Sequence, residues 1–316
     1  MTEHEIIDSF SAAIMQAGIT PPDSIEADGD LHRFSTNGRR NDKAGYYVLH
    51  LDGVPAGLFG CWRSGIERKW RADLGRPLSA SEIAQMSARA AEQAAIRDAH
   101  RQAESQAAAD VCSEIWSAAS PAKKHAYLQS KGITSALGCK VIDGSDPCVD
   151  RMFWSGDSWL SGALLLIPIC DGTGDMVSLQ AIDEHGAKSF ARKGRKRGGF
   201  HLIGDINERG TILLGEGLAT VWAALQMIDG SAFGAVAFDA GNLEVVAKTL
   251  RLRFPSATII VLSDVDENQR GEMESKKAAQ AVRGIAWKPE FSLRQLSSGM
   301  TDFWDMWNDK ERRVSK

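Results

Sequence analysis

The carboxy-terminal third of the chain predicts an α/β fold, a parallel sheet with helices on both faces. Three runs rich in branched apolar residues alternate there with three segments whose apolar residues recur at helical spacing. Strands that alternate with short helical crossovers favour a parallel sheet. The predicted strands, with their following turns, are 211–217, 235–242 and 257–268. The predicted helices are 218–228, 243–254 and 275–284.

Composition limits the class of protein. The 316 residues are 43% hydrophobic and 25% charged, which fits a globular chain rather than a fibre or a disordered tail. No run approaches the ~18 apolar residues of a membrane helix. The acidic start MTEHEIIDSF is unlike a secretory signal. We therefore expect a cytoplasmic protein with no membrane partner.

The spacing of the cysteines and histidines restricts the kinds of metal site that the chain could form. The five cysteines form no CxxC pair, and the seven histidines form no HxH or HExxH pair. Neither a zinc ribbon nor a histidine-built zinc site is therefore expected. Any bound metal should be a hard cation held by carboxylates.

Three segments precede the α/β domain. The first combines a helix at 5–18 with a strand pair that turns at Asp52-Gly53, a hairpin dipeptide, so it predicts an α+β domain. The second is Ala-rich and free of Pro and Gly, which predicts one long helical arm or two antiparallel helices with a break. The third is an α+β subdomain with two strands joined by a turn at 171–174. The predicted domains are 1–78, 79–119, 120–207 and 208–316.

Three acidic residues follow the predicted strands of the α/β domain. Glu216 lies in the turn after the first strand, and Asp264 and Asp266 follow the third. Ligands of such sheets bind at the carboxyl ends of the strands. In an extended chain residues i and i+2 point to one side, so the Asp-x-Asp pair presents two carboxylates to one cation. These residues predict a Mg²⁺ (or Mn²⁺) site.

A second motif overlaps the first of these acids. Residues 215–220, GEGLAT, nearly match the dinucleotide fingerprint GxGxxG, and Asp239 stands where a ribose-binding acid would. Two features weigh against a dinucleotide. Thr220 replaces the glycine that lets helix and strand pack closely, and Glu216 places a negative charge where the pyrophosphate would lie. Asp239 has an alternative interpretation as the cap of the helix that begins at Leu243.

Basic residues are clustered although the net charge is −4. Five cations occupy six consecutive positions of one segment and predict a site for nucleic-acid or nucleotide phosphates. They are Arg192, Lys193, Arg195, Lys196 and Arg197. A second set interleaves Trp62 and Trp70 with Arg63, Arg68, Lys69 and Arg71. Such a mixture would stack bases and neutralise phosphate, or simply form a solvated strand pair.

At its carboxylates the sequence resembles the TOPRIM domain, the metal-binding fold of bacterial-type primases, topoisomerases and some nucleases. The TOPRIM signature is a glutamate in a Gly-rich turn after the first strand and a DxD after the third. Glu216 within GEG and Asp264/Asp266 within SDVDEN match it over about residues 208–310.

The resemblance to TOPRIM primases of phages and plasmids extends further. It includes AVAFDAGNL, the helix that bears Lys276 and Lys277, and an acidic motif DFWD with Asp302 and Asp305, in which tryptophan replaces a common asparagine. Upstream, LLIPICDGTGDMVSLQAID and KSFARKGRKRGGFHLIG resemble the subdomain before TOPRIM in bacterial primases. The segment GYYVLHLDGVPAGLFGCW also resembles the amino-terminal region of these proteins.

The resemblance implies a DNA primase that makes short primers on single-stranded DNA from NTPs. Asp264 and Asp266 would bind Mg²⁺, Asp302 or Asp305 would share a second ion, and Glu216 would be a ligand or the general base. Lys277, Lys276 and the basic cluster would neutralise triphosphate and template. A zinc ribbon and a fused helicase, usual in primases, have no counterpart here. That departure suggests a separate replicative helicase as partner. A TOPRIM nuclease and a non-catalytic DNA-binding protein remain open alternatives.

Overall fold

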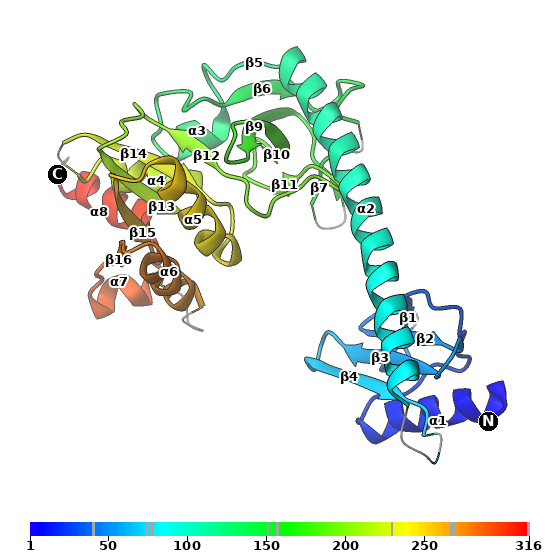
Figure 1. Cartoon of the computed structure of the whole chain (residues 1–316). Helices are drawn as coiled ribbons and strands as arrows, with labels where there is room; N and C mark the ends of the chain where they lie inside the picture. Colours follow the sequence, from blue (N-terminus) through cyan, green and yellow to red (C-terminus); the bar gives the residue numbers. More distant parts are fainter. Residues whose placement is uncertain are drawn as a thin grey trace. The chain divides into compact units, whose positions relative to one another are not determined.

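The alanine-rich stretch forms one uninterrupted helix, α2 (Ala80–Ala118), in the computed structural model (Figure 1). The alternative of two antiparallel helices is therefore wrong. Two units divide the chain, residues 1–99 and 100–316, and α2 contributes to both. None of the described helices is long and apolar enough to cross a membrane. The structure describes residues 1–39, 42–73, 75, 79–150, 152–155, 158–228, 230–265 and 270–314.

The first unit is a four-stranded antiparallel sheet with one helix packed on it. Its elements are α1 (Glu3–Gln16), β1 (His32–Phe34), β2 (Gly45–His50), β3 (Ala56–Cys61) and β4 (Ile66–Arg71), with strand order β1-β2-β3-β4. Helix α1 buries Phe10 and Ile14 against Tyr47, Leu49 and Phe59 of the sheet. The predicted hairpin turn joins β2 to β3. The alternate side chains of the strands form an opposite, outer face.

The second unit contains an antiparallel sheet of strand order β11-β10-β9-β6-β5. Its strands are β5 (Ser120–Pro121), β6 (Lys140–Asp143), β9 (Ala163–Cys170), β10 (Met176–Ile182) and β11 (Lys188–Phe190). The predicted short helix is α3 (Ala126–Ser130), and a small pair, β7 (Trp154–Ser155) and β8 (Ser158–Trp159), lies beside the sheet. The end of α2 packs Cys112 and Ile115 against Leu164 and Leu166 of β9.

The predicted α/β domain is also in the second unit. Its sheet has the order β12-β14-β13-β15-β16, in which all neighbours are parallel except β12 and β14. The strands are β12 (His201–Ile203), β13 (Thr211–Gly215), β14 (Ala232–Val236), β15 (Thr258–Leu262) and β16 (Ile285–Trp287). The helices are α4 (Leu218–Leu225), η1 (Ala240–Asn242), α5 (Leu243–Arg253), α6 (Arg270–Ala281), α7 (Leu293–Ser297) and α8 (Phe303–Val314).

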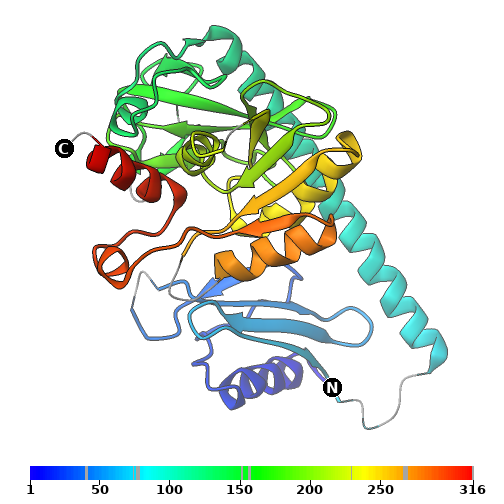
Figure 2. The ribbon, with the colours of Figure 1, turned by 90° about the vertical axis from the view of Figure 1, so that its left-hand side faces the viewer.

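Helices cover both faces of this sheet, which confirms the sequence-based prediction (Figure 1, Figure 2). Helices α5 and α6 pack on the face that carries Ile212 and Leu214 of β13. Helices α4 and α8 pack on the other face, around Leu213. That second core also includes Ile167 of β9, so the two sheets of the unit share a hydrophobic core. Apolar burial on both faces explains why β13 is a continuous apolar run.

The sequence prediction missed the two edges of the sheet. Strand β12 adds to β14 in the antiparallel direction, and β16 extends the other edge. Both strands have only three residues, too short for a clear alternation of apolar and polar positions. Strand β14 begins at Ala232, earlier than predicted, because Phe233 is also buried in the core.

Candidate active site

Glu216 lies at the carboxyl end of the central strand β13, between Gly215 and the first turn of α4. Its backbone carbonyl accepts a hydrogen bond of 3.0 Å from the amide of Phe238, just past β14. The side chain is half-buried. Phe238 has a φ of +70°, a left-handed conformation that is uncommon for an aromatic residue. Backbone strain of this kind concentrates at functional sites, and here it adjoins the candidate glutamate.

Asp264 comes two residues after β15 and meets Glu216 at the first turn of α6. The meeting point is Gly271, where a Cβ would lie 3.5 Å from the carbonyl oxygen of Asp264 and 3.7 Å from Oε1 of Glu216. The structure therefore brings these two predicted residues to one place. Asp266 lies outside the described residues.

Asp302 and Asp305 flank the first turn of α8 and bond to each other's backbone. Asp302 Oδ1 accepts the amide of Asp305 at 2.9 Å, and Asp305 Oδ2 accepts the amides of Thr301 and Asp302 at 2.7 and 3.3 Å. This reciprocal arrangement is a capping box, which satisfies orphan amides of a helix terminus. The DFWD motif thus has a local structural role, and the predicted metal roles of both residues stay predictions.

Two long-range contacts hold Asp302 near the strand ends. Its Oδ2 accepts a hydrogen bond of 3.0 Å from the buried hydroxyl of Thr220 in α4. The amide of Val265, next to Asp264, donates to the carbonyl of Thr301 at 2.7 Å. Thr220, which departs from the dinucleotide fingerprint, therefore holds the carboxylate of Asp302 in place by a hydrogen bond.

The described acids do not form a closed metal cage. Oxygen atoms of Glu216, Asp264 and Asp302 are not gathered within 4.8 Å of one another. Carboxylates borne on adjacent strand ends still suit Mg²⁺ or Mn²⁺, because these cations accept oxygen ligands and keep several waters. The residues present fit such an ion as a partial set of ligands.

The basic cluster follows β11 and is tied down mainly by ion pairs. Lys193 pairs with Glu104 of α2, Arg195 pairs with Asp171 at 2.9 Å, and Lys196 pairs with Asp239. Arg192 lies over the ring of Trp159 at 5.5 Å. Arg197 forms no ion pair with any residue that the structure describes. Together with Arg195, it lines an open hollow of about 600 Å³ beside α5.

Asp239 does not cap the helix that begins at Leu243, because the N-cap residue of α5 is Asn242. Asp239 stands at the start of η1, where its side chain makes no capping hydrogen bond and its carboxylate pairs with Lys196. The helix-cap interpretation of Asp239 is therefore wrong. Asp239 follows Phe238, whose amide bonds to the carbonyl of Glu216, so this ion pair brings the basic cluster to the edge of the sheet that carries the acids.

Asn242 anchors the basic cluster to the sheet and was missed by the sequence prediction. Its Nδ2 donates to the carbonyls of Gly199 and Ala237 at 2.9 Å each, and its Oδ1 accepts the amide of Gly198 at 2.7 Å. The side chain is 3% exposed. Its Nδ2 also donates to the carbonyl of Lys196 at 3.3 Å. A buried asparagine that satisfies four backbone groups fixes a loop in one position. Its signal in the sequence was the AGN that follows the second strand.

Lys276 and Lys277 project from α6 and pair with other acids. Lys276 bonds to Glu272 at 2.7 Å, and Lys277 bonds to Glu244 of α5 at 2.9 Å. Glu244 raises the pKa of Lys277, mainly through this hydrogen bond. Both side chains are exposed, so their predicted roles toward a triphosphate stay predictions.

Lys188 is a further basic residue that the sequence prediction did not single out. Its ammonium lies 5.3 Å from the ring of Tyr127, and desolvation, then Lys131, lower its pKa, whereas Asp302 raises it. Burial raises the pKa of Tyr127 to about 12, and Asp302 acts in the same direction. The start of β11 therefore lies within electrostatic reach of the acid at α8. The sequence signal was the KSF that precedes the basic cluster.

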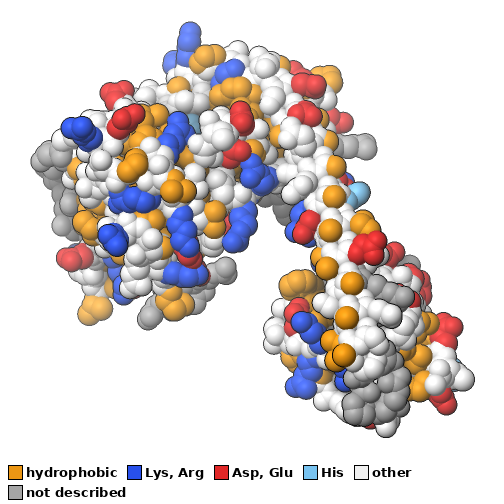
Figure 3. Space-filling model, in the orientation of Figure 1, with side chains coloured by type: hydrophobic (Ala, Val, Ile, Leu, Met, Phe, Trp, Pro, Cys, Tyr) orange, Lys and Arg blue, Asp and Glu red, His pale blue; other side chains and the backbone are white. Residues whose placement is uncertain are grey.

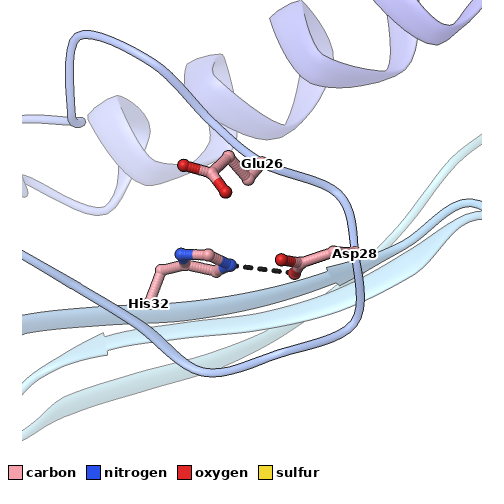
Figure 4. Close-up of side chains that lie close together, drawn as sticks. All are labelled: Glu26, Asp28 and His32. Carbon is pink, nitrogen blue, oxygen red and sulfur yellow. Dashed lines mark hydrogen bonds and ion pairs between the residues drawn. The ribbon is translucent and has the colours of Figure 1, made fainter.

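A different group meets the distance requirement for a metal site in the first unit. Ligand atoms of Glu26, Asp28 and His32 lie within 4.8 Å of one another, the one such group of three among the described residues (Figure 4). Asp28 and His32 form a hydrogen bond of 2.8 Å, which lowers the pKa of Asp28 and raises that of His32. This ion pair accounts for the group, and we assign no metal to it.

Comparison with known proteins identifies a homologue. The chain is 31% identical to a DNA primase TraC of Escherichia coli over 300 residues, which is 90% of this chain and 26% of that protein. A second Escherichia coli DNA primase TraC is 31% identical over 303 residues, covering 90% of this chain and 20% of the relative. The chain thus spans about a quarter of the length of these relatives. No protein-family model matches it.

Solved primase structures give weaker matches. The primase fragment of the bacteriophage T7 primase-helicase has 16% identity and a TM-score of 0.37, covering 57% of this chain and 66% of that one. A DNA primase domain from Pseudomonas aeruginosa has 15% identity and a TM-score of 0.37, covering 66% and 78%.

Proposed function

We propose that this chain is a DNA primase-type nucleotidyltransferase with a TOPRIM domain, which makes short primers on single-stranded DNA for phage or plasmid replication. The observation that carries the proposal is the 31% identity to DNA primase TraC over 90% of the chain. The arrangement of acids at the ends of β13 and β15 supports it, because phosphoryl transfer needs clustered oxygen ligands for divalent cations.

In this proposal Glu216 and Asp264 hold Mg²⁺ or Mn²⁺, with Asp266 and Asp302 completing the ligand set. When bound, the cation would neutralise developing charge on the phosphates. Alternatively, Glu216 would accept the proton of a primer 3′-hydroxyl as the general base. Asp305 is an equal candidate for the place of Asp302, because both already accept hydrogen bonds: one oxygen of Asp305 accepts two backbone amides, and each oxygen of Asp302 accepts one hydrogen bond.

The basic residues would bind the phosphates of template and nucleotide. Lys188, on β11, and Lys196, in the loop that follows it, would bind phosphate. Asp302 acts on the charge of Lys188, and Lys196 pairs with Asp239. Arg195 and Arg197 line the hollow beside α5 and would neutralise the template backbone. The ion pairs of Arg195 with Asp171 and of Lys196 with Asp239 keep these two side chains ordered, which lowers the entropy cost of binding.

Primer synthesis on single-stranded DNA with labelled NTPs and Mg²⁺ tests the proposal. Glu216→Gln and Asp264→Asn should each lower synthesis at least about a hundredfold, as expected when a general base or metal ligand is removed. Glu208→Gln, an exposed acid in the loop before β13, is the matched control and should keep full activity. Binding of Mn²⁺, followed by electron paramagnetic resonance, should weaken in the first two variants alone.

The lengths of labelled strands in the same assay distinguish a primase from the two alternative functions. A nuclease would shorten labelled strands without NTPs, and a non-catalytic DNA-binding protein would neither extend nor shorten them. Synthesis that survives both acidic substitutions would overturn the proposed site.

A further inference from the structure

We propose that the outer face of the first unit's sheet binds single-stranded nucleic acid through Trp62 and the cations of β4. This site is separate from the residues of the proposed primase chemistry and does not depend on that proposal. The ligand of this site is an unpaired strand whose bases are exposed.

Strand alternation divides the aromatic and basic residues of this segment between two faces. Trp70 points inward, where its ring packs edge-on against Phe10 at 5.2 Å, and Arg68 two residues earlier is on the same side. Lys69 and Arg71 are therefore on the outer side, and both are exposed. The interleaved residues of the sequence thus contribute one tryptophan to the core and leave Trp62 for the surface.

Trp62 forms a prepared stacking surface. Its side chain is 63% exposed, and its ring lies 4.7 Å from the ring of Tyr46 at an angle of 30°. Tyr46 is itself buried and fixed, because its hydroxyl donates to Glu67 at 2.8 Å. The Tyr46 side chain crosses Gly60, and only a glycine leaves room for it there, because a Cβ would lie 2.5 Å from the tyrosine oxygen. One side of the Trp62 ring is thus supported, while its large exposed area is available to a base.

The charge of the outer face suits a phosphate backbone. Arg33 is paired with Tyr46 in the strand register, so it joins Lys69 and Arg71 on this face. Glu67 is the one acid of β4, and it lies on this face with its carboxylate held by the hydroxyl of Tyr46, so the three cations exceed it in charge. In Figure 3 basic side chains lie along the side of the first unit where β3 and β4 are drawn in Figure 1. Trp62 follows the end of β3 that pairs with Ile66, and Arg71 pairs with Ala56 at the other end, so a strand of several nucleotides would run from the stacking ring to the cations. A stacking ring combined with several cations on one face is the pattern of sequence-tolerant single-strand binding.

A paired helix or a protein partner fits these features less well. A duplex hides the base faces that a tryptophan stacks on, whereas an unpaired strand presents them. The core of a protein interface is depleted of charged residues, whereas this face carries Arg33, Lys69 and Arg71, all of them exposed.

Photocrosslinking of the full-length chain tests the proposal. The probe is an oligothymidylate of about eight nucleotides with 5-iodouracil substitutions, within the usual site size of such surfaces. We expect the crosslinked peptide to contain Trp62. The crosslink should persist in the Glu216→Ala chain and without NTPs, so failure of primer synthesis leaves this result intact.

A pair of substitutions on one strand provides a matched control. Arg71→Gln removes a cation from the outer face, and Arg68→Gln makes the same change on the opposite face. When the yield of the Trp62 crosslink is titrated at several salt concentrations, Arg71→Gln should reduce the salt slope by about 0.7. Arg68→Gln should leave it unchanged. The proposal is overturned if no crosslink maps to Trp62, or if both arginine variants behave alike.

Discussion

Replacing Asn242 with alanine should destabilise the second unit and release the basic cluster. The asparagine is 3% exposed and satisfies the amide of Gly198 and the carbonyls of Gly199 and Ala237. Alanine removes all of these bonds and offers no replacement. Since Ala237 follows β14 and the glycines follow the basic cluster, the substitution cuts a link between the cluster and the sheet.

The magnitude follows from the groups left unpaired. One amide and three carbonyls, including that of Lys196, lose their partners, at about 1–3 kcal/mol for each group that water cannot reach. The Gly198 amide is only partly buried and regains some solvation, whereas the bonds to Gly199 and Ala237 are fully buried. We therefore expect a loss of about 3–5 kcal/mol in the free energy of unfolding.

Urea unfolding followed by tryptophan fluorescence measures this loss. The chain has nine tryptophans, and all except Trp62 and Trp70 are in the second unit. Asn207→Ala is the control, because Asn207 is exposed and bonds to the side chain of Ser231 at 2.9 Å, so its loss should cost less than about 1 kcal/mol. Equal unfolding midpoints for the two variants would refute the anchoring role.

Three further predictions concern single residues. Desolvation lowers the pKa of buried His201 from 6.5 to about 4. Between these two pH values the imidazole binds a proton in the unfolded chain but not in the folded chain. Stability should therefore fall by about 3 kcal/mol as pH drops from about 6.5 to about 4, and His201→Gln should reduce this dependence in urea titrations, whereas exposed His100→Gln should not. Thr220→Val should lose the hydrogen bond to Asp302 and cost about 1–2 kcal/mol, with recovery in Thr220→Ser; equal stability of the two variants would contradict this. Gly271→Ala should fold normally, since its Cβ makes only ordinary contacts, while Gly271→Val should fold but lose synthesis; a fully active valine variant would argue against the site.

Much of the site could be predicted because it follows the order of strands. Glu216 and Asp264 each come directly after an apolar run, and the carboxyl ends of parallel strands share one edge of the sheet. Their proximity at Gly271 was therefore implied before any side chain was placed. The capping box of Asp302 and Asp305 was also readable, as an acid three residues after a capping residue.

Other parts depend on contacts between residues far apart in sequence. The bonds from Thr220 to Asp302 and from Asn242 to Gly199 join segments separated by 82 and 43 positions. No periodicity or spacing encodes such a pair, because many loop paths would satisfy the same local pattern. The ion pair of Lys196 with Asp239 likewise decided between two interpretations of that acid.

By itself the sequence determined the α/β order, the helical character of the alanine-rich segment and the acids at the strand ends. These features rest on local propensity and on the apolar period of each segment, which act over a few residues. Only the tertiary structure decided which cations reach the sheet edge, which tryptophan of the first unit is exposed, and which asparagine fixes the basic cluster. Such choices depend on packing between distant segments, where burial and hydrogen-bond satisfaction are settled together.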